Sequence, residues 1–268
     1  MPQDDPQIAQ PSSPALSAFI AEMERFPVWT FADVVKIAII AFVAILFSGV
    51  LAIMIVTGLP WFHGMPMDKV VTDARLATGS QLLAYLITFW FVYRLIVRHY
   101  GIPFLEGVRW RWPGGKWPIY ILAGLVLCLA TQALERVLPQ PKHIPLADLF
   151  RTPLAAWLLV IFGTFIGPPA EELFFRGLLF PSLARKMNLL WSVVLTALPF
   201  ALLHAAQLAF GWGPLLGIFF VGVVLTLVRA KADSLAASIL VHVAYNALTF
   251  GLVIYATQGF QHLERIRG

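Results

Sequence analysis

Long apolar runs separated by short polar or proline-containing segments make up most of this chain. A helix needs about 20 predominantly apolar residues to cross the hydrocarbon core of a bilayer. On that basis the runs predict seven membrane helices, over about 32–55, 81–97, 118–134, 153–183, 190–208, 214–228 and 235–255. The expected fold class is therefore all-α, a polytopic transmembrane bundle of about seven or eight membrane helices.

The fourth run is too long for one straight crossing. Its residues, roughly 30 in number, would form a helix of about 45 Å, whereas the hydrocarbon core is about 30 Å thick. Gly167, Pro168 and Pro169 lie in its middle. Proline removes a backbone donor and disfavours helix at the preceding residue. We expect a bend or a new helix start there, with the freed carbonyls received by protein or by a cavity.

Composition supports a membrane protein over a soluble domain. Hydrophobic residues make up 59% of the chain and charged residues only 12%, whereas soluble domains are about 25% charged. Clusters of lysine and arginine follow the second, fourth and sixth runs, which predicts a cytoplasmic N-terminus and an external C-terminus, with Arg265 and Arg267 of the tail as the misfit. The net charge of +5 therefore reflects membrane orientation, and without a basic patch carrying interleaved aromatics it does not predict nucleic-acid binding.

The pattern divides the chain into four parts. Residues 1–30 form a polar N-terminal tail, in which 15–26 place apolar residues at helical spacing and favour either an interfacial helix or a soluble lead-in turn. Residues 31–149 contain the N-terminal membrane helices, residues 150–256 a membrane core that carries polar side chains, and residues 257–268 a C-terminal tail. The short length and the charge pattern favour a multi-pass protein of a bacterial inner membrane.

Three charged residues lie inside the fourth apolar run: Glu171, Glu172 and Arg176. A charge at the centre of a membrane helix costs about 2.5–3.5 kcal/mol, so such residues usually mark a functional site that faces the protein interior. The spacing of four places Arg176 on the same helix face as Glu172 and predicts an ion pair that supports the site. Glu171 points about 100° away and is left free for chemistry.

Two of the six histidines fall inside predicted membrane helices. By spacing, His204 shares a helix face with Phe200, and His242 shares one with Asn246. With Glu171 these residues suit hydrolysis, since a carboxylate and an imidazole take a proton from water while amide and imidazole N–H groups stabilise an oxyanion. No serine nucleophile elbow is present, so direct attack by water is favoured over an acyl-enzyme.

The same side chains could instead hold a metal. A catalytic zinc takes three protein ligands and a water, and the alternative ligand set is Glu171, His204 and His242. The H-E-x-x-H pattern of zinc peptidases is absent and the three candidates come from three separate helices. No cofactor is therefore expected, and zinc is the alternative.

Three motifs in this order resemble the signatures of the CPBP family, the CAAX-protease and bacteriocin-processing (Abi) group that includes the type II CAAX prenyl endopeptidase. They are Glu171-Glu172-x-x-x-Arg176, Phe200-x-x-x-His204 and His242-x-x-x-Asn246. The resemblance covers about residues 150–251 and implies that 150–256 are the catalytic core of an intramembrane endopeptidase with a glutamate-type mechanism.

Carried over position by position, the resemblance implies that Glu171 and His204 activate the water and that His242 and Asn246 form the oxyanion site. It implies structural support from Glu172 and Arg176, with Phe200 beside them. The family has often been called metalloprotease, and its eukaryotic members cleave after a prenylated cysteine. The residues predict neither feature, and a bacterial inner membrane is not expected to offer prenylated substrates.

The expected partners are the lipid bilayer and a peptide or membrane-protein substrate. A non-enzymatic alternative is a membrane transporter or a bacteriocin-immunity-type peptide-binding protein that uses the carboxylates as a proton relay or receptor. Loss of Asn246 separates the two, since a proton relay has little use for an oxyanion donor. A plain membrane scaffold is the third reading, and it would tolerate removal of the Glu171 charge.

Overall fold

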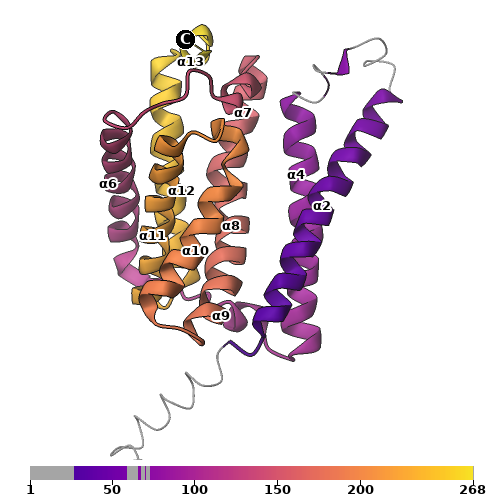
Figure 1. The fold of residues 1–268 in the computed structure, drawn as a ribbon, viewed down its shortest axis with the longest axis vertical. Helices are drawn as coiled ribbons and strands as arrows, with labels where there is room; N and C mark the ends of the chain where they lie inside the picture. Colours follow the sequence, from indigo (N-terminus) through magenta and orange to yellow (C-terminus); the bar gives the residue numbers. More distant parts are fainter. Residues whose placement is uncertain (1–26, 59–65, 68–69, 71–72, 268) are drawn as a thin grey trace, which may run out of the picture.

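The computed structural model describes residues 27–58, 66–67, 70 and 73–267, and the regular elements in that part are all helices (Figure 1). They are α2 (Phe31–Thr57), α4 (Ala74–Tyr93), η2 (Arg94–His99), α5 (Phe104–Gly107), η3 (Gly114–Lys116), α6 (Trp117–Glu135), η4 (Pro145–Leu149), α7 (Pro153–Ile161), η5 (Phe162–Ile166), α8 (Gly167–Glu172), η6 (Leu173–Leu179), α9 (Phe180–Ala184), α10 (Leu189–Leu203), η7 (Ala206–Leu208), α11 (Trp212–Ala232), α12 (Leu235–Ala256) and α13 (Glu264–Arg267). The predicted all-α bundle is confirmed. The possible interfacial helix at 15–26 lies outside the described residues.

Six helices in the described part are long and apolar enough to cross a bilayer, which makes this a multi-pass membrane protein. They are Phe31–Thr57, Ala74–His99, Gly114–Glu135, Pro153–Ala184, Trp212–Ala232 and Leu235–Ala256. The fifth predicted span, 190–208, is wrong in its extent. Helix α10 has 15 residues and ends at Leu203, which gives it a length of only about 22 Å. The chain then turns through η7 before α11 begins.

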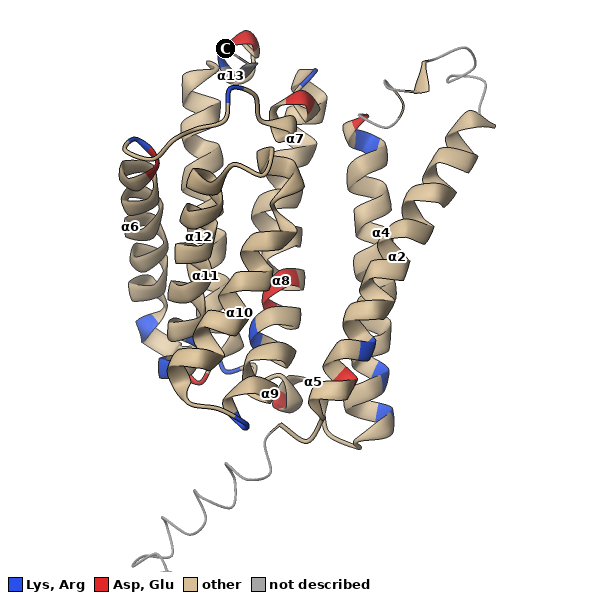
Figure 2. Cartoon of the chain, in the orientation of Figure 1, with Lys and Arg blue, Asp and Glu red and all other residues tan. Residues whose placement is uncertain are grey.

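Successive long segments run in opposite directions. Helix α2 begins at one end of the bundle and α12 ends at the other, with α10 as the short crossing between α9 and α11 (Figure 1). Figure 2 shows blue Lys and Arg segments at both ends of the bundle, with more of them at the end where α2 begins and α4 ends. Basic charge is therefore unevenly divided between the two ends, in the direction that the sequence pattern predicts.

The fourth segment is helical from Pro153 to Ala184, and within it α8 begins at Gly167 with Pro168 and Pro169 in its first turn, which is one of the two outcomes that the sequence predicts. The chain widens into π-helical turns, η5 and η6, on both sides of α8. In η5 the Gly167 N–H donates to the Phe162 carbonyl, five residues back. Pro168 has no N–H to continue this pattern, which leaves the Gly163 carbonyl without its backbone donor. A π turn thus absorbs the prolines without ending the helix.

Side chains from neighbouring helices take up the carbonyls that the prolines free. The Asn246 Nδ2 atom of α12 donates to the Gly163 carbonyl at 2.7 Å. In η6 the Phe180 N–H bonds to the Phe175 carbonyl, and Pro181 then leaves the Arg176 carbonyl free. The Arg229 Nε atom of α11 donates to that oxygen at 3.2 Å. The expectation that protein would receive freed carbonyls is thereby met.

Helix α12 is held closely on two sides by glycines. A Cβ atom added at Gly124 of α6 would lie 2.3 Å from the Val241 carbonyl oxygen and 2.7 Å from the Ala244 Cβ atom. One added at Gly163 would lie 2.7 Å from the Phe250 ring. Small residues permit this close approach of membrane helices. The packing fixes the turn of α12 that carries His242.

Candidate active site

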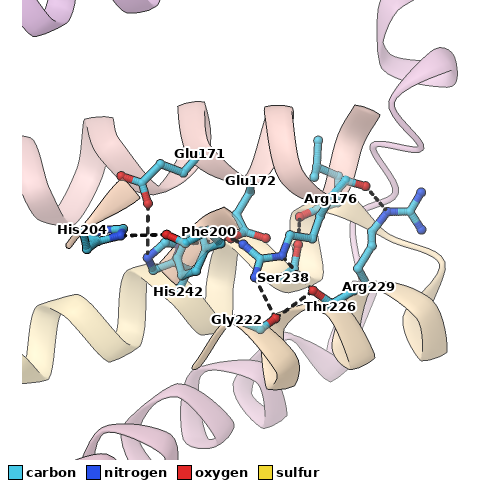
Figure 3. Close-up of polar contacts among 11 residues, drawn as sticks. Glu171, Glu172, Arg176, Phe200, His204, Gly222, Thr226, Arg229, Ser238 and His242 are labelled. Carbon is cyan, nitrogen blue, oxygen red and sulfur yellow. Dashed lines mark hydrogen bonds and ion pairs between the residues drawn. The ribbon is translucent and has the colours of Figure 1, made fainter. Parts of the chain in front are cut away.

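The two adjacent glutamates of α8 occupy different environments. The Glu172 side chain is completely buried, whereas the Glu171 side chain is 22% exposed. Figure 3 shows the Glu171 carboxylate next to the rings of His204 and His242, with Glu172 turned toward Arg176. The accessible carboxylate is therefore the one that the sequence left free for chemistry.

Glu172 forms the predicted ion pair with Arg176. Arg176 Nη1 donates to Glu172 Oε1 at 2.7 Å, and both side chains are fully buried. The rest of the guanidinium is satisfied by the Gly222 carbonyl at 2.8 Å and the Thr226 hydroxyl at 3.2 Å, both on α11. Its carbon also lies 4.5 Å from the centre of the Phe200 ring. A buried charge pair persists only with such compensation, so the pair links α8, η6, α10 and α11.

His242 connects the two glutamates. Its Nδ1 atom lies 3.0 Å from Glu172 Oε1, and its Nε2 atom lies 3.9 Å from Glu171 Oε2. A carboxylate paired with arginine accepts hydrogen bonds, so this partner assigns the proton to Nδ1. In the neutral ring the lone pair of Nε2 then faces Glu171. The histidine is only 4% exposed. Its orientation is set by the hydrogen bond to the buried Glu172 carboxylate.

His204 lies just beyond the last residue of α10, where the helix stops. Its Nδ1 atom is 3.0 Å from the Phe200 carbonyl oxygen, which as an acceptor places the proton on Nδ1 here too. The Phe200 ring stands beside both imidazoles, with centroids 5.3 Å from His204 and 5.8 Å from His242. Phe200 thus spaces the two histidines, and Nε2 is the free ring nitrogen of each.

Asn246 lies one turn after His242 on α12, and its amide is already in use. Nδ2 donates to the Gly163 carbonyl, which leaves one of the two amide N–H groups for another acceptor. The amide is therefore anchored to the π turn that precedes the glutamates. This contact could not be foreseen, because the sequence pattern does not indicate which carbonyl a π turn frees.

Tyr85 is a site residue that the sequence reasoning missed. It comes from α4, its ring stacks on Phe162 at 5.7 Å and 14°, and its hydroxyl lies near enough to Glu171 and Gln81 to interact with both electrostatically. A tyrosine in an apolar run was a weak signal by itself. Only the packing of α4 beside α7 and η5 brings it to the carboxylate.

The described residues contain no group of three or more His, Cys, Asp or Glu side chains that could hold a metal ion. The alternative ligand set Glu171, His204 and His242 thus does not form such a group in this structure. Metal dependence stays a prediction of that alternative, which metal analysis of the purified protein tests.

One protein-family model matches part of the chain. Residues 153–248 match the family model "Type II CAAX prenyl endopeptidase Rce1-like". This segment belongs to the CAAX-protease family. The CAAX-protease segment runs from α7 into α12 and contains all seven candidate residues: Glu171, Glu172, Arg176, Phe200, His204, His242 and Asn246. No curated protein and no solved structure gives a significant match to the chain.

The CAAX-protease segment leaves α2, α4 and α6 outside its limits. Tyr85 and Gly124 therefore lie outside the matched region, although both contact it. The membrane helices and the family together indicate an endopeptidase that acts on peptide or protein substrates in a lipid bilayer.

Proposed function

We propose that this chain is an intramembrane endopeptidase in which Glu171 and His242 together hold and deprotonate the attacking water. The observation that carries the proposal is the 3.9 Å separation of Glu171 Oε2 and His242 Nε2. It is too long for a direct hydrogen bond and suits two acceptors that share one water molecule. The carboxylate and the unprotonated Nε2 atom are both proton acceptors.

The buried pair behind His242 supports this role. Glu172 accepts from Nδ1 and so keeps Nε2 directed at Glu171 and free of a proton in the neutral ring. Arg176 holds Glu172 in place. The arrangement resembles other sites in which a base is oriented by a third group through its second nitrogen.

The reaction then proceeds by one proton transfer in each direction. Glu171 takes a proton from water, and the resulting hydroxide attacks the carbonyl carbon of the scissile peptide. The remaining N–H of Asn246 donates to the developing oxyanion. His242, which the family resemblance assigns to the oxyanion site, presents an unprotonated Nε2 atom here and therefore takes the water-binding role that the resemblance gives to His204. As the carbon–nitrogen bond breaks, Glu171 returns the proton to the leaving amine. His204, with its free Nε2 atom beside Phe200, is placed to accept the second water proton or to orient the substrate.

The substrate class follows from the site's position. Glu171 and His242 lie on membrane-spanning segments, so the scissile bond belongs to a polypeptide that reaches the site within or at the surface of the bilayer. The matching family model is described as a CAAX prenyl endopeptidase. A C-terminal peptide with a lipidated cysteine is therefore one test substrate, and unlipidated membrane peptides are the other.

The test uses the purified full chain reconstituted in liposomes with both kinds of peptide, and cleavage is read by mass spectrometry. Glu171→Gln keeps the shape of the side chain and removes its ability to accept a proton. We expect cleavage to fall about 10²- to 10⁴-fold, the usual contribution of a general base. The matched control is Glu135→Gln on α6, a membrane-helix carboxylate outside the site, which should retain activity.

If Glu171→Gln cleaves the peptide as fast as the native chain does, the glutamate mechanism is wrong. Cleavage by neither the native chain nor any variant, over both peptide classes, would favour the non-enzymatic alternative. A zinc content of one ion per chain, lost in Glu171→Gln together with activity, would favour the metal alternative.

A further inference from the structure

A basic cavity lies outside the active site, between the first turns of α2 and the end of α4. It has a volume of about 350 Å³ and is lined by the cationic side chains of Lys36, Arg94 and Arg98. Asp33 and His99 also line it. The charge in this cavity is therefore mainly positive, and the cavity lies at the end of the bundle that carries more of the Lys and Arg segments (Figure 2).

The carboxylate in the cavity is already saturated by the protein. Asp33 accepts from the Tyr100 hydroxyl at 2.6 Å, from the Thr30 hydroxyl and N–H at 2.7 and 3.0 Å, and from Lys36 Nζ at 3.1 Å. Among the described residues, neither Arg94 nor Arg98 pairs with a carboxylate; the guanidinium of Arg94 lies 5.0 Å over the Trp90 ring. Two exposed arginines thus face the cavity without an acidic partner.

An apolar cavity lies next to the basic one. Its volume is about 380 Å³, and it is lined entirely by hydrophobic side chains of α2 and α4. Ile40 and Phe91 line both cavities, so the two are adjacent. Ala44 is only 3% exposed, whereas Val43 and Phe47 are each 55% exposed. The second cavity therefore opens toward the bilayer along α2.

We propose that the two cavities bind one molecule of an anionic phospholipid, with the phosphate at Arg94, Arg98 and Lys36 and an acyl chain along α2. A basic pocket between membrane helices that continues into an apolar groove fits an amphiphile with a negative head. Free phosphate would use only the first cavity, and a zwitterionic lipid would gain less from the two unpaired arginines. This site goes beyond the proposed peptidase activity and uses none of its residues.

The basic side chains lie at the ends of their helices, which is the level of the lipid head groups in a bilayer. Lys36 lies in the second turn of α2 and Arg98 near the end of the Ala74–His99 segment, where basic side chains meet lipid head groups. The positive-inside pattern assigns this end to the cytoplasmic leaflet, which carries anionic lipid.

The test is a lipid titration of the purified full chain in nonionic detergent, followed by native mass spectrometry. The probes are dioleoyl phosphatidylglycerol and dioleoyl phosphatidylcholine. We expect the native chain to prefer phosphatidylglycerol by about tenfold or more. Arg94→Gln/Arg98→Gln should reduce binding of that lipid by about fivefold per arginine removed and abolish the preference.

A matched control removes two charges from the same end of the bundle. Lys116→Gln/Lys231→Gln changes exposed basic residues that do not line either cavity, and the preference should persist. Val43→Trp fills the apolar cavity and should weaken binding of both lipids while the arginines remain. Excess inorganic phosphate should leave the bound phospholipid in place.

Three outcomes would overturn the lipid site. They are equal binding of the two lipids by the native chain, an equal loss of preference in the two double variants, and displacement of the phospholipid by inorganic phosphate. The last would assign the basic cavity to a free phosphate anion.

Discussion

Glu171 and Glu172 are neighbours on one helix, but they have different environments and different proposed roles in the candidate site. Glu172 is enclosed by Arg176 and His242, and in the proposed mechanism it acts only through the orientation of His242. Glu171 keeps part of its surface open and faces the unprotonated nitrogen of that same ring. The helix makes this division possible because adjacent side chains point about 100° apart.

Asn246 has a structural role, the hydrogen bond to the Gly163 carbonyl, and a proposed catalytic role as the oxyanion donor. A double variant separates the two roles. Asn246→Ala removes the donor to the Gly163 carbonyl and also the proposed oxyanion donor. We expect lower thermal stability and a fall in cleavage of about 10²- to 10³-fold. Adding Pro168→Ala restores a backbone N–H five residues after Gly163. Stability, read as the midpoint of thermal unfolding, should then recover, while the cleavage rate should not.

The control is Pro168→Ala alone, which should cleave normally because a carbonyl oxygen accepts two hydrogen bonds. If Pro168→Ala/Asn246→Ala recovers the rate as well as the stability, Asn246 serves only to hold the π turn, and the oxyanion role fails.

Local spacing was enough to predict some residue contacts and not others. The Glu172–Arg176 pair and the shared face of Phe200 and His204 follow from a separation of four residues in a helix. The contacts of Tyr85 with Phe162 and of Asn246 with Gly163 join positions far apart in the sequence. Such contacts depend on which helices pack together, and hydropathy does not encode that.

At the scale of the element, the approach of α6 to α12 decides where His242 stands. Gly124→Ala would bring a methyl group within 2.3 Å of the Val241 carbonyl, so the helices must separate. We expect a loss of about 1–3 kcal/mol in the free energy of unfolding, as for other overpacked sites. Cleavage should fall too, although every proposed catalytic side chain is intact. Thermal unfolding and the peptide assay measure the two effects.

Gly49→Ala on α2 is the matched control, because a Cβ atom there meets nothing within 4 Å. It should be neutral or slightly stabilising, since alanine favours helix over glycine. A Gly124→Ala variant as stable and active as Gly49→Ala would show that the close approach of α6 and α12 does not position the site.

Hydropathy predicted the long elements well and the interrupted ones poorly. The first, second and third spans lie within helices observed at Phe31–Thr57, Ala74–His99 and Gly114–Glu135. The fourth was expected to bend or to start a new helix at its prolines, and α8 does begin there, but the π turns on both sides of it were not predicted. Apolar sequence after Leu203 extended the predicted fifth span, whereas the chain there forms η7 and a turn. Apolar composition alone does not distinguish helix from an apolar turn.

At the scale of the whole molecule, the short α10 brings His204 to the candidate site. Because α10 ends at Leu203, His204 lies just beyond the tip of a short helix, where the Phe200 ring stands beside it and beside His242. The chain then turns through η7, so the histidine of the second motif stays next to the ring that also contacts the histidine of the third.

Counting α10 as a crossing makes the number of crossings odd, so the two ends of the described chain face opposite sides of the membrane. With Cys128, which is fully buried, replaced by alanine, single cysteines report this directly. Lys116→Cys marks the basic end and Gln261→Cys the end beyond α12; both positions are exposed. In intact cells an impermeant maleimide should label Gln261→Cys alone, and Lys116→Cys should react only after permeabilisation, as the positive-inside pattern requires.

Labelling of both positions from one side would contradict α10 as a crossing. Labelling of Lys116→Cys alone in intact cells would reverse the orientation and place the proposed lipid site in the outer leaflet.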